Sequence, residues 1–284
     1  MIDETVRRIE AMETQSASQV AVDAAEALGE LLDREFRSVE EFERSLERNS
    51  RTLRQANRSH APLYTTQRRV LDAVAAAEPD DVEAAKAGLS AAIDDAVERV
   101  KTSKNGAGEQ AATLIDDGDT LLTHENSSTV MAALDHALAA GKSFDLYVTE
   151  SRPRFLGRRT ARQLAGYDGV DVTLIVDGAA GHVLAECDRV LVGMNCLIDD
   201  TVYNRIGTYG IATAAADRDV PFTVVGASAK FVGDSGFTFE NARRPPAEVL
   251  REPADGFGAS NPGYDATPLR LVDAVVTEDD VLRL

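Results

Sequence analysis

The stretch that decides the fold is residues 189–208, which read RVLVGMNCLIDDTVYNRIGT. Its first five residues form an apolar run typical of a strand that is buried on both faces of a sheet. Polar and small residues follow at once, and residues 204–208 lead into a helical pattern of small residues. A buried strand, a polar loop and a helix N-terminus in this order are typical of the edge at which open α/β sheets bind ligands.

Strands and helices alternate on both sides of this stretch. Short apolar runs predict strands at residues 120–124, 144–149, 172–176, 189–193, 221–225 and 274–277. Helices are predicted at residues 127–140, 157–164 and 206–216. This alternation predicts an α/β fold with a Rossmann-like, mostly parallel, doubly wound sheet. The long connection at 233–268 is rich in Gly and Pro, and such a connection in a compact domain is often functional.

The first 105 residues show helical patterns and almost no strand signal. Ser38 is followed three residues later by Glu41, which is the spacing of a capping box and predicts a helix start. A further helix is expected to start at Thr65 or Thr66, because either hydroxyl can cap it.

The segment at residues 104–108, KNGAG, has the composition of a linker. The apolar residues before it follow a helical period, and those after it include the short runs of strands. We therefore expect two domains, a helical N-terminal domain at 1–105 and a Rossmann-like ligand-binding domain at 106–284.

The net charge of the chain is unusual. There are 48 acidic and 30 basic residues, a formal net charge of -18, and only five of the basic residues are lysines. An acidic excess of this kind is similar to the surfaces of halophilic proteins. It also argues against direct binding of nucleic acid, which requires basic clusters.

The cysteines and the N-terminal residues indicate the cellular compartment of the protein. Cys187 and Cys196 form no CxxC pair, so we expect a reducing compartment. The first residues carry charges throughout and lack the apolar core of a signal peptide. No window approaches the ~18 to 20 apolar residues that a membrane-spanning helix needs. The sequence therefore predicts a soluble, cytoplasmic protein without a membrane partner.

Polar side chains follow several of the predicted strands. They are His124, Glu125, Asn126, Glu150, Ser151, Arg152, Asp177 and Asn195. Because the carboxyl ends of parallel strands meet at one edge of a sheet, these residues predict a polar small-molecule pocket. The arginines and helix N-termini of this edge suit an anionic group such as phosphate.

Each of these residues also has a structural interpretation. Glu150 and Arg152 are candidates for an internal salt bridge that shapes the loop. Asp177 is suited to capping the next turn, and Asn195 to capping the loop after its strand. We keep both interpretations open for these positions.

Familiar cofactor and nucleophile motifs are absent from the sequence. No GxGxxG follows a strand, and there is neither a P-loop nor a GxSxG. His60, His136 and His182 show no spacing that suggests a metal site. We therefore expect neither a cofactor nor a metal ion.

Five segments, in this order within residues 118–277, resemble the motifs of one superfamily. They are THENS at 123–127, VTESRP at 148–153, VGMN at 192–195, NRIGT at 204–208 and NPGYDATP at 261–268. The superfamily joins the α, β and δ subunits of translation initiation factor 2B, ribose-1,5-bisphosphate isomerase and methylthioribose-1-phosphate isomerase. The resemblance implies a helical N-terminal domain, a Rossmann-like C-terminal domain, a sugar-phosphate pocket between them, and dimers or larger assemblies.

The resemblance also implies roles for single residues. The isomerases use a cysteine in T-H-C-N-S and an aspartate in G-A-D, and this chain has Glu125 and Asn195 at those positions. Their Arg-Gly-Ala turn is replaced by QSA at 15–17. The implied ligand-binding residues are Arg58, Asn126, Ser127, Glu150, Arg152, Asn204 and Arg205.

Two functions follow from these departures. Aldose–ketose isomerisation needs groups that exchange protons, and Asn195 cannot ionise. This favours a non-catalytic protein of the initiation-factor-2B type, which binds a sugar phosphate or nucleotide and acts through protein contacts, including contacts with initiation factor 2 subunits. The alternative is a sugar-phosphate isomerase of the ribose-1,5-bisphosphate type with Glu125 as its base. We expect a homo-oligomer, a dimer or larger, in both cases.

The acidic surface generates a prediction about salt. We expect the melting temperature to rise with potassium chloride into the molar range, because screening relieves the repulsion among the excess carboxylates. Thermal unfolding followed by circular dichroism at increasing potassium chloride measures this. A melting temperature that stays level or falls would contradict the halophilic interpretation.

Overall fold

The computed structural model describes residues 2–10, 17–233, 237, 239–241, 243–252 and 255–284. The chain divides into two compact units. The first comprises residues 1–102 and 229–240, and the second comprises residues 103–228 and 241–284.

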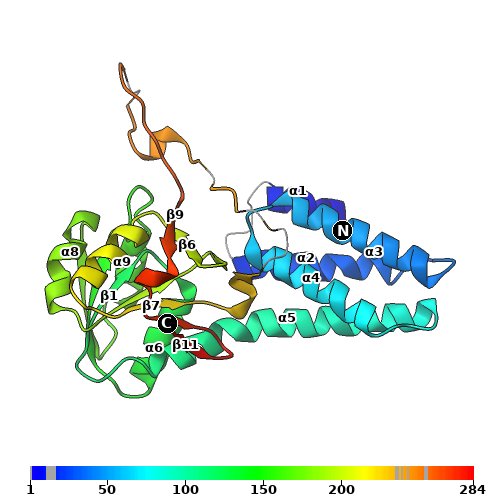
Figure 1. Cartoon of the computed structure of the whole chain (residues 1–284), viewed down its shortest axis with the longest axis horizontal. Helices are drawn as coiled ribbons and strands as arrows, with labels where there is room; N and C mark the ends of the chain where they lie inside the picture. The colour runs from blue at the N-terminus through cyan, green and yellow to red at the C-terminus, as the bar shows by residue number, and fades with distance from the viewer. Residues whose placement is uncertain (1, 11–16, 234–236, 238, 242, 253–254) are drawn as a thin grey trace. The chain divides into compact units, whose positions relative to one another are not determined.

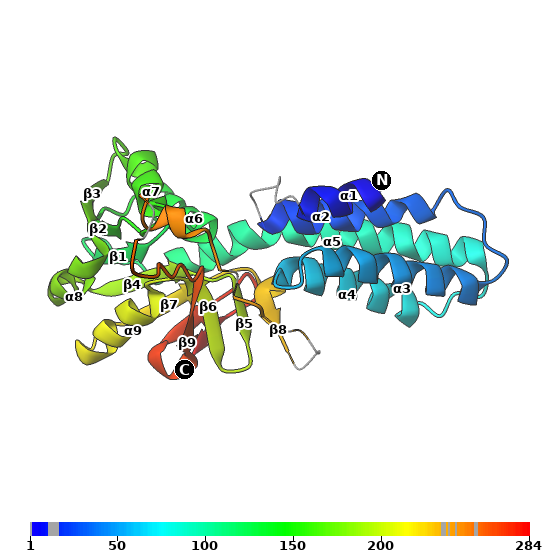
Figure 2. The same cartoon turned by 90° about the horizontal axis from the view of Figure 1, so that it is seen from above.

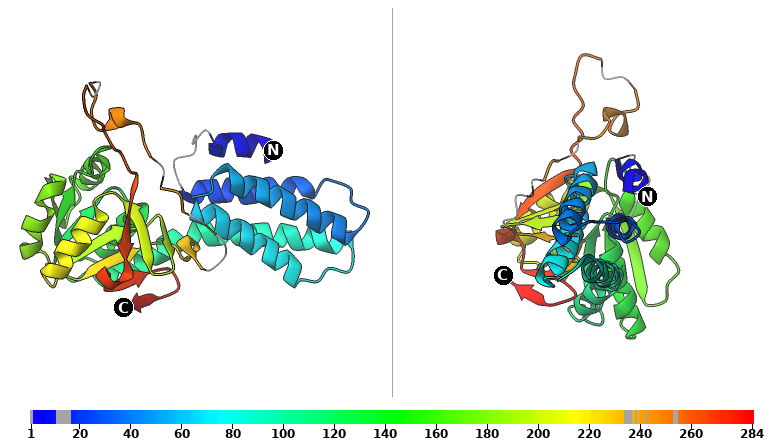
Figure 3. Two further views of the ribbon diagram at one scale, coloured as in Figure 1. Left: turned by 45° about the horizontal axis from the view of Figure 1, so that its top comes forward. Right: turned by 90° about the vertical axis from the view of Figure 1, so that its right-hand side faces the viewer.

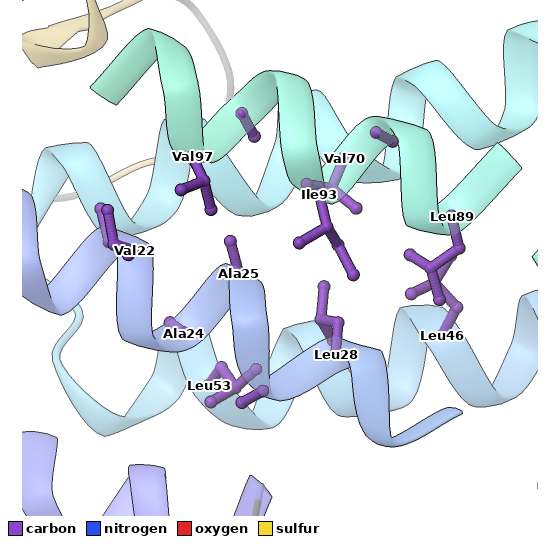
Figure 4. Close-up of a cluster of buried hydrophobic side chains, with 14 of the residues drawn as sticks. Val22, Ala24, Ala25, Leu28, Leu46, Leu53, Val70, Leu89, Ile93 and Val97 are labelled. Atoms are coloured by element: carbon purple, nitrogen blue, oxygen red, sulfur yellow. The ribbon is translucent and has the colours of Figure 1, made fainter. Parts of the chain in front are cut away.

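The first unit is helical among its described residues. Its elements are α1 (Ile2–Glu10), α2 (Ala17–Ala27), η1 (Leu28–Leu31), α3 (Val39–Ala56), α4 (Ala61–Ala76), most of α5 (Val82–Ala112) and β8 (Phe231–Val232). The helices run side by side (Figures 1 and 3) and bury one apolar core. Figure 4 shows how Leu28, Ile93 and Leu53 from three helices fill its centre.

Local side-chain chemistry sets where two of these helices begin. The Ser38 hydroxyl accepts from the Glu41 N–H at 3.3 Å, and the Glu41 carboxylate accepts from the Arg37 N–H at 2.9 Å. This confirms the predicted helix start at Ser38, although the Glu41 carboxylate accepts from the N–H of Arg37 and not from that of Ser38 as in a standard capping box. The predicted start of α4 at Thr65 or Thr66 is wrong, because His60 Nδ1 caps the helix five or six residues earlier by accepting from Leu63 N–H at 3.0 Å.

The predicted linker at residues 104–108 is also wrong, because these residues lie within α5. Its glycines serve packing and not a turn. A Cβ at Gly108 would lie 2.6 Å from the Cβ of Ala132, and one at Gly106 would lie 3.0 Å from the Cβ of Glu278. Glycine therefore allows close approach to neighbouring residues of the second unit.

The second unit is built on a seven-stranded sheet with the order β11-β10-β7-β4-β1-β2-β3. Its strands are β1 (Thr120–His124), β2 (Phe144–Thr149), β3 (Val170–Ile175), β4 (Arg189–Gly193), β7 (Phe222–Val225), β10 (Ala274–Val276) and β11 (Val281–Arg283). All neighbours pair in parallel except β10 and β11. The central strands are apolar and buried, as the sequence predicts for a doubly wound sheet, and the predicted fold class is confirmed.

Helices cover both faces of this sheet (Figure 2). They are α6 (Ser128–Ala139), α7 (Leu156–Leu164), α8 (Ala180–Val183) and α9 (Thr208–Asp217), with the 3-10 turns η2 (Asp177–Ala179), η3 (Leu184–Glu186), η4 (Ser228–Lys230), η5 (Pro246–Glu248) and η6 (Leu269–Leu271). The chain runs outward from β1 through β2 to β3, and returns to β4 on the other side of β1. The switch point of the topology therefore lies between β1 and β4, where such sheets bind ligands.

The segment after β4 differs from the predicted polar loop. It forms an antiparallel hairpin of β5 (Cys196–Ile198) and β6 (Thr201–Arg205), and β6 also pairs with β9 (Tyr264–Pro268). Asp199, with a φ of 48°, supports the tight turn between β5 and β6. Along β6, Val202 and Asn204 point inward while Tyr203 and Arg205 are half-buried, which is the alternation of a strand.

The cap of α4 generates a prediction about pH. Burial lowers the pKa of His60 from 6.5 to about 4, with a smaller contribution from the positive Lys230. The folded state then holds fewer protons on His60 than the unfolded state between these values, so stability falls as pH drops from about 6.5 to about 4. We expect His60→Asn, which keeps a cap acceptor, to remove up to about 3 kcal/mol of this pH dependence. Urea unfolding of both proteins across this range tests it, and parallel pH profiles would contradict it.

Candidate functional site

Glu125 lies at the switch point, directly after β1. Its backbone has a φ of 68°, and its carbonyl accepts from the Thr160 hydroxyl at 2.7 Å. The residue is only 9% exposed, and its Oε2 lies 3.6 Å from Nε of Arg205. A Cβ at Gly193, the last residue of β4, would overlap the Ser127 hydroxyl and lie 3.8 Å from Oε1 of Glu125. The ends of β1 and β4 thus enclose a buried carboxylate beside a guanidinium group.

Arg205 is held in place by the hairpin. It ends β6 opposite Tyr264 of β9, and its guanidinium lies over that ring at 4.8 Å from the centroid. The preceding residue, Asn204, is buried and donates to the Thr208 hydroxyl at 3.1 Å. Asn204 therefore fixes the start of α9, while Arg205 faces the sheet edge.

The N-terminus of α9 already has an anion. The Asp265 carboxylate accepts from the N–H groups of Gly207 at 2.7 Å and Tyr209 at 3.0 Å. A carboxylate in this position satisfies amides that have no partner within the helix and favours its dipole. The amides of Gly207 and Tyr209 at this helix end are therefore already occupied by an internal carboxylate.

His124 is buried behind the site and joins its elements. Nδ1 lies 2.6 Å from the Thr149 hydroxyl, and Nε2 lies 2.9 Å from the Ile206 carbonyl. A carbonyl only accepts, so Nε2 carries the proton and Nδ1 accepts from Thr149. A Cβ at Gly207, which has a φ of 110°, would lie 2.9 Å from the imidazole ring. We infer a structural role for His124.

The loop after β2 is shaped by two carboxylates. The Asp177 carboxylate accepts from the N–H groups of Ser151 and Arg152, both at 2.7 Å. Glu150 pairs with Arg158 at 2.6 Å, and not with Arg152. Both acids therefore hold the backbone and side chains of the loop that presents Arg152.

A small cavity of about 20 Å³ lies beside this loop. Its lining residues are Ser151, Arg152, Pro153, Arg154, Leu156, Arg205, Ile206, Arg244, Asn261, Pro262 and Gly263. The pKa of Arg154 is lowered, first by burial and then by the positive charges of Arg244 and Arg205. Four arginines thus surround the cavity, and such a concentration of positive charge favours an anionic ligand.

The structure brings three of the predicted site residues to one edge, namely Glu125, Arg205 and Arg152. Asn126 points elsewhere, because its amide donates to the Thr160 hydroxyl and to Oε1 of Gln163, both at 2.8 Å. That side chain lines a separate groove between α6 and α7.

Other predicted residues have different surroundings. The Ser127 hydroxyl caps α6 by accepting from Val130 N–H at 3.4 Å. Asn195 is half-buried after β4, and its N–H donates to the Tyr203 carbonyl at 2.8 Å. Arg58 is exposed in the turn after α3, in the first unit. Of the predicted QSA replacement, residues 15 and 16 lie outside the described residues. These assignments to a ligand site stay predictions.

The cavity also contains residues that the sequence alone did not assign to the site. Arg154 lies just beyond the strand at 144–149, among the arginines expected to suit an anion, but it was not assigned to the ligand site because nothing in the sequence separates it from surface arginines. Arg244 and its partner Glu248 lie in the connection at 233–268, which has no periodic pattern. Only the length of that connection indicated a functional role.

Two further classes of site receive no support. Burial raises the pKa of Cys187 to about 11, which keeps this thiol protonated and a poor nucleophile. Among the described residues no group of three or more His, Cys, Asp or Glu side chains is placed to bind a metal ion. In the same part of the chain, no helix combines the length and apolar character needed to cross a membrane.

Comparison with known proteins identifies the family. Residues 13–283 match the model of the initiation factor 2 subunit family. The chain belongs to this family. It is 36% identical to the ribose 1,5-bisphosphate isomerase of Haloterrigena turkmenica, over 96% of this chain and 88% of that protein. It is 33% identical to the 5-deoxyribose 1-phosphate isomerase of Moorella thermoacetica, over 93% and 81%. The crystal structure of the translation initiation factor eIF-2B of Pyrococcus horikoshii OT3 matches with a TM-score of 0.78 and 25% identity, over 99% of this chain and 96% of that one.

These relatives correct the interpretation of the chain as a non-catalytic protein of the initiation-factor-2B type. Relatives that are 31–36% identical over most of the chain are named ribose 1,5-bisphosphate isomerases. The physical premise of that interpretation was the loss of two catalytic side chains. That premise gave more weight to the non-ionisable Asn195 than to the carboxylate of Glu125, which the structure buries at the switch point beside an arginine.

Proposed function

We propose that the protein is an aldose–ketose isomerase acting on a phosphorylated ribose, of the ribose-1,5-bisphosphate type. The observation that carries this proposal is the buried Glu125 carboxylate facing Arg205 at the switch point. The names of the most similar relatives support the substrate class.

The chemistry requires one carbon-bound proton to move. In ribose 1,5-bisphosphate the C1–O4 bond breaks, the C2 hydrogen ends on C1, and the proton of the C2 hydroxyl ends on the released O4. The product is the ketose, and no electrons leave the substrate. A single carboxylate can transfer the proton between the two carbons, because the proton that it takes from C2 is the one that it returns to C1. We assign this role to Glu125, with solvent carrying the proton from O2 to O4.

Neighbouring residues support this assignment. Arg205 lies 3.6 Å from the Glu125 carboxylate and can stabilise the negative charge that develops on the sugar oxygens. Asn195 follows β4 on the other side of the switch point, and its amide can bind a sugar hydroxyl without taking a proton. The strained backbone at Glu125 and its bond to Thr160 keep the carboxylate at the edge of the sheet.

We further propose that the isomerase is a cytoplasmic homodimer, or a larger homo-oligomer, adapted to high salt. The net charge of -18 supports the adaptation. The solved structure of a tetrameric eIF2B-beta2-delta2 complex shares the fold, with a TM-score of 0.80.

The proposed assembly has a direct measurement. We expect light scattering at micromolar concentration in molar potassium chloride to give at least twice the mass of the 30.5 kDa chain. A mass of one chain under these conditions would refute it.

The role of Glu125 predicts a loss of turnover. We expect the wild type to convert ribose 1,5-bisphosphate to the ribulose product, as followed by phosphorus NMR. Glu125→Gln keeps the shape but cannot accept a proton, so kcat should fall by roughly 10²- to 10⁴-fold.

Glu186→Gln provides the matched control. Glu186 is also a carboxylate of the second unit, but it accepts from the Tyr147 hydroxyl at 2.8 Å in η3, before β4 begins. We expect this variant to turn over at the wild-type rate. Equal rates for both variants would exclude Glu125 as the base, and absence of turnover in the wild type would refute the isomerase itself.

A further inference from the structure

Three guanidinium groups from separate segments meet beside the Glu125 site. Arg154 follows β2, Arg205 ends β6, and Arg244 precedes η5. All three line the same cavity, which also includes Arg152. The mutual effect of these charges appears in the lowered pKa of Arg154, to which Arg244 and Arg205 both contribute after burial.

The carboxylates that contact these arginines are too few to neutralise their positive charge. Arg205 pairs with Glu125. Arg154 and Arg244 share Glu248, whose Oε1 lies 4.0 Å from Nε of Arg154 and 3.6 Å from Nη1 of Arg244.

The fourth arginine, Arg152, contacts a carbonyl and an aromatic ring and brings no further carboxylate to the cavity. The Arg152 guanidinium donates to the Val249 carbonyl at 3.0 Å and lies over the Phe155 ring. Among the described residues, four guanidinium groups therefore have two carboxylate partners. The Asp177 carboxylate is also near, but it is occupied by backbone N–H groups.

The Glu248 contacts are also loose. Distances of 3.6 and 4.0 Å exceed those of charge-assisted hydrogen bonds, which are about 2.7 to 2.9 Å. Glu248 is held instead by its own segment, because its Oε2 accepts from the Asn261 amide at 3.0 Å. A tetrahedral dianion with three terminal oxygens matches the planar forks of several arginines better than one carboxylate does.

We propose that Arg154 and Arg244, together with Arg205, form a subsite for the dianion of a phosphate monoester, and that Glu248 is a displaceable internal anion in this subsite. The inference rests on the proposed function and deepens it, because it assigns residues to one phosphate of the sugar. The segment that carries Arg244 and Glu248 leads into β9 (Figure 1). Its residues Glu248 and Val249 contact Arg154 and Arg152, which precede α7.

Phosphate binding requires this segment to shift. The cavity of about 20 Å³ holds little more than a water molecule. Asn261 holds the segment by accepting from Arg244 N–H at 2.9 Å and by donating to Glu248 and to the Pro245 carbonyl. Arg152 donates to the Val249 carbonyl, and Asn241 exchanges two bonds with Tyr264 at 2.7 and 3.2 Å. Displacement of Glu248 releases its pairs with Arg154 and Arg244 and opens the cavity toward both arginines.

Titration calorimetry with inorganic phosphate, at fixed potassium chloride, tests the subsite without requiring turnover. We expect Arg154→Gln and Arg244→Gln to weaken phosphate binding roughly tenfold or more, the worth of a charge-assisted hydrogen bond. Glu248→Gln keeps the bond to Asn261 but removes the competing charge, so it should tighten binding severalfold. Thermal unfolding of each variant checks that the fold is intact.

Arg159→Gln is the matched control. Arg159 is an exposed arginine of α7, five residues after Arg154, and it lines the groove between α6 and α7 instead of the cavity. It undergoes the same loss of charge, and we expect it to bind phosphate as the wild type does. Equal weakening in Arg159→Gln, unchanged binding in Glu248→Gln, or no phosphate binding by the wild type would each overturn the subsite.

Different experimental results would refute the phosphate subsite and the isomerase activity. If the variants change phosphate binding as expected but no protein converts ribose 1,5-bisphosphate, the subsite stands and the proposed function falls. If the wild type is an active isomerase and Arg154→Gln and Arg244→Gln leave its KM unchanged, the function stands and the subsite falls. If both proposals hold, Arg154→Gln and Arg244→Gln raise KM much more than they lower kcat, because these arginines bind the phosphate and not the reacting carbons.

Discussion

The close contact between the ends of β1 and β4 is the constraint on which the site depends. Gly193 has no side chain, and the space that one would fill is taken by Ser127, with the carboxylate of Glu125 in van der Waals contact beside it. Ser127 in turn caps α6, and the carbonyl of Glu125 is fixed by Thr160 of α7. One packing contact therefore couples two helices to the position of a buried charge, and it does so at the point where the topology of the sheet reverses.

The carboxylates at this edge of the sheet fall into two groups, which bind different partners. Asp177 and Asp265 neutralise backbone N–H groups, at the loop after β2 and at the start of α9. Glu125 and Glu248 contact side-chain guanidinium groups. Because backbone amides cannot move away without unfolding their element, the first pair is structural. The second pair is exchangeable, since an arginine side chain can adopt another partner with a change of rotamer.

The sequence predicts the sheet well because its central strands are buried on both faces, and burial leaves an apolar run wherever it occurs. It predicts the helix start at Ser38 because the hydroxyl and the Glu41 N–H that it accepts from lie within one turn. It fails at Gly106 and Gly108, where the glycines serve contacts with residues distant in the sequence. It also fails at residues 196–205, because the hairpin there is short and its pairing with β9 depends on residues some sixty positions later.

The same distinction applies to the candidate site. Glu125, Arg152 and Arg205 follow strand ends, so topology alone places them at the edge. Asn126 also follows a strand, yet local bonds to α7 turn it away. Arg244 and Glu248 belong to a segment without periodicity, and only the folded contacts bring them to Arg154.

The arginine cluster has a particular meaning in a chain of net charge -18. Under the proposed function the ligand is an anionic sugar phosphate. The net negative charge of the protein repels such a ligand, so long-range attraction cannot deliver it to the site. In molar salt the screening length falls to about 3 Å, and this repulsion disappears together with any steering. What remains is the attraction at contact distance, which several converging guanidinium groups supply. Arg205 and Arg244 are half-buried, which shields their charges in part from the salt. A concentrated, partly buried cluster of arginines is therefore the form of anion site that a highly acidic protein can use at high salt, and it explains why positive charge is gathered at this edge of the sheet.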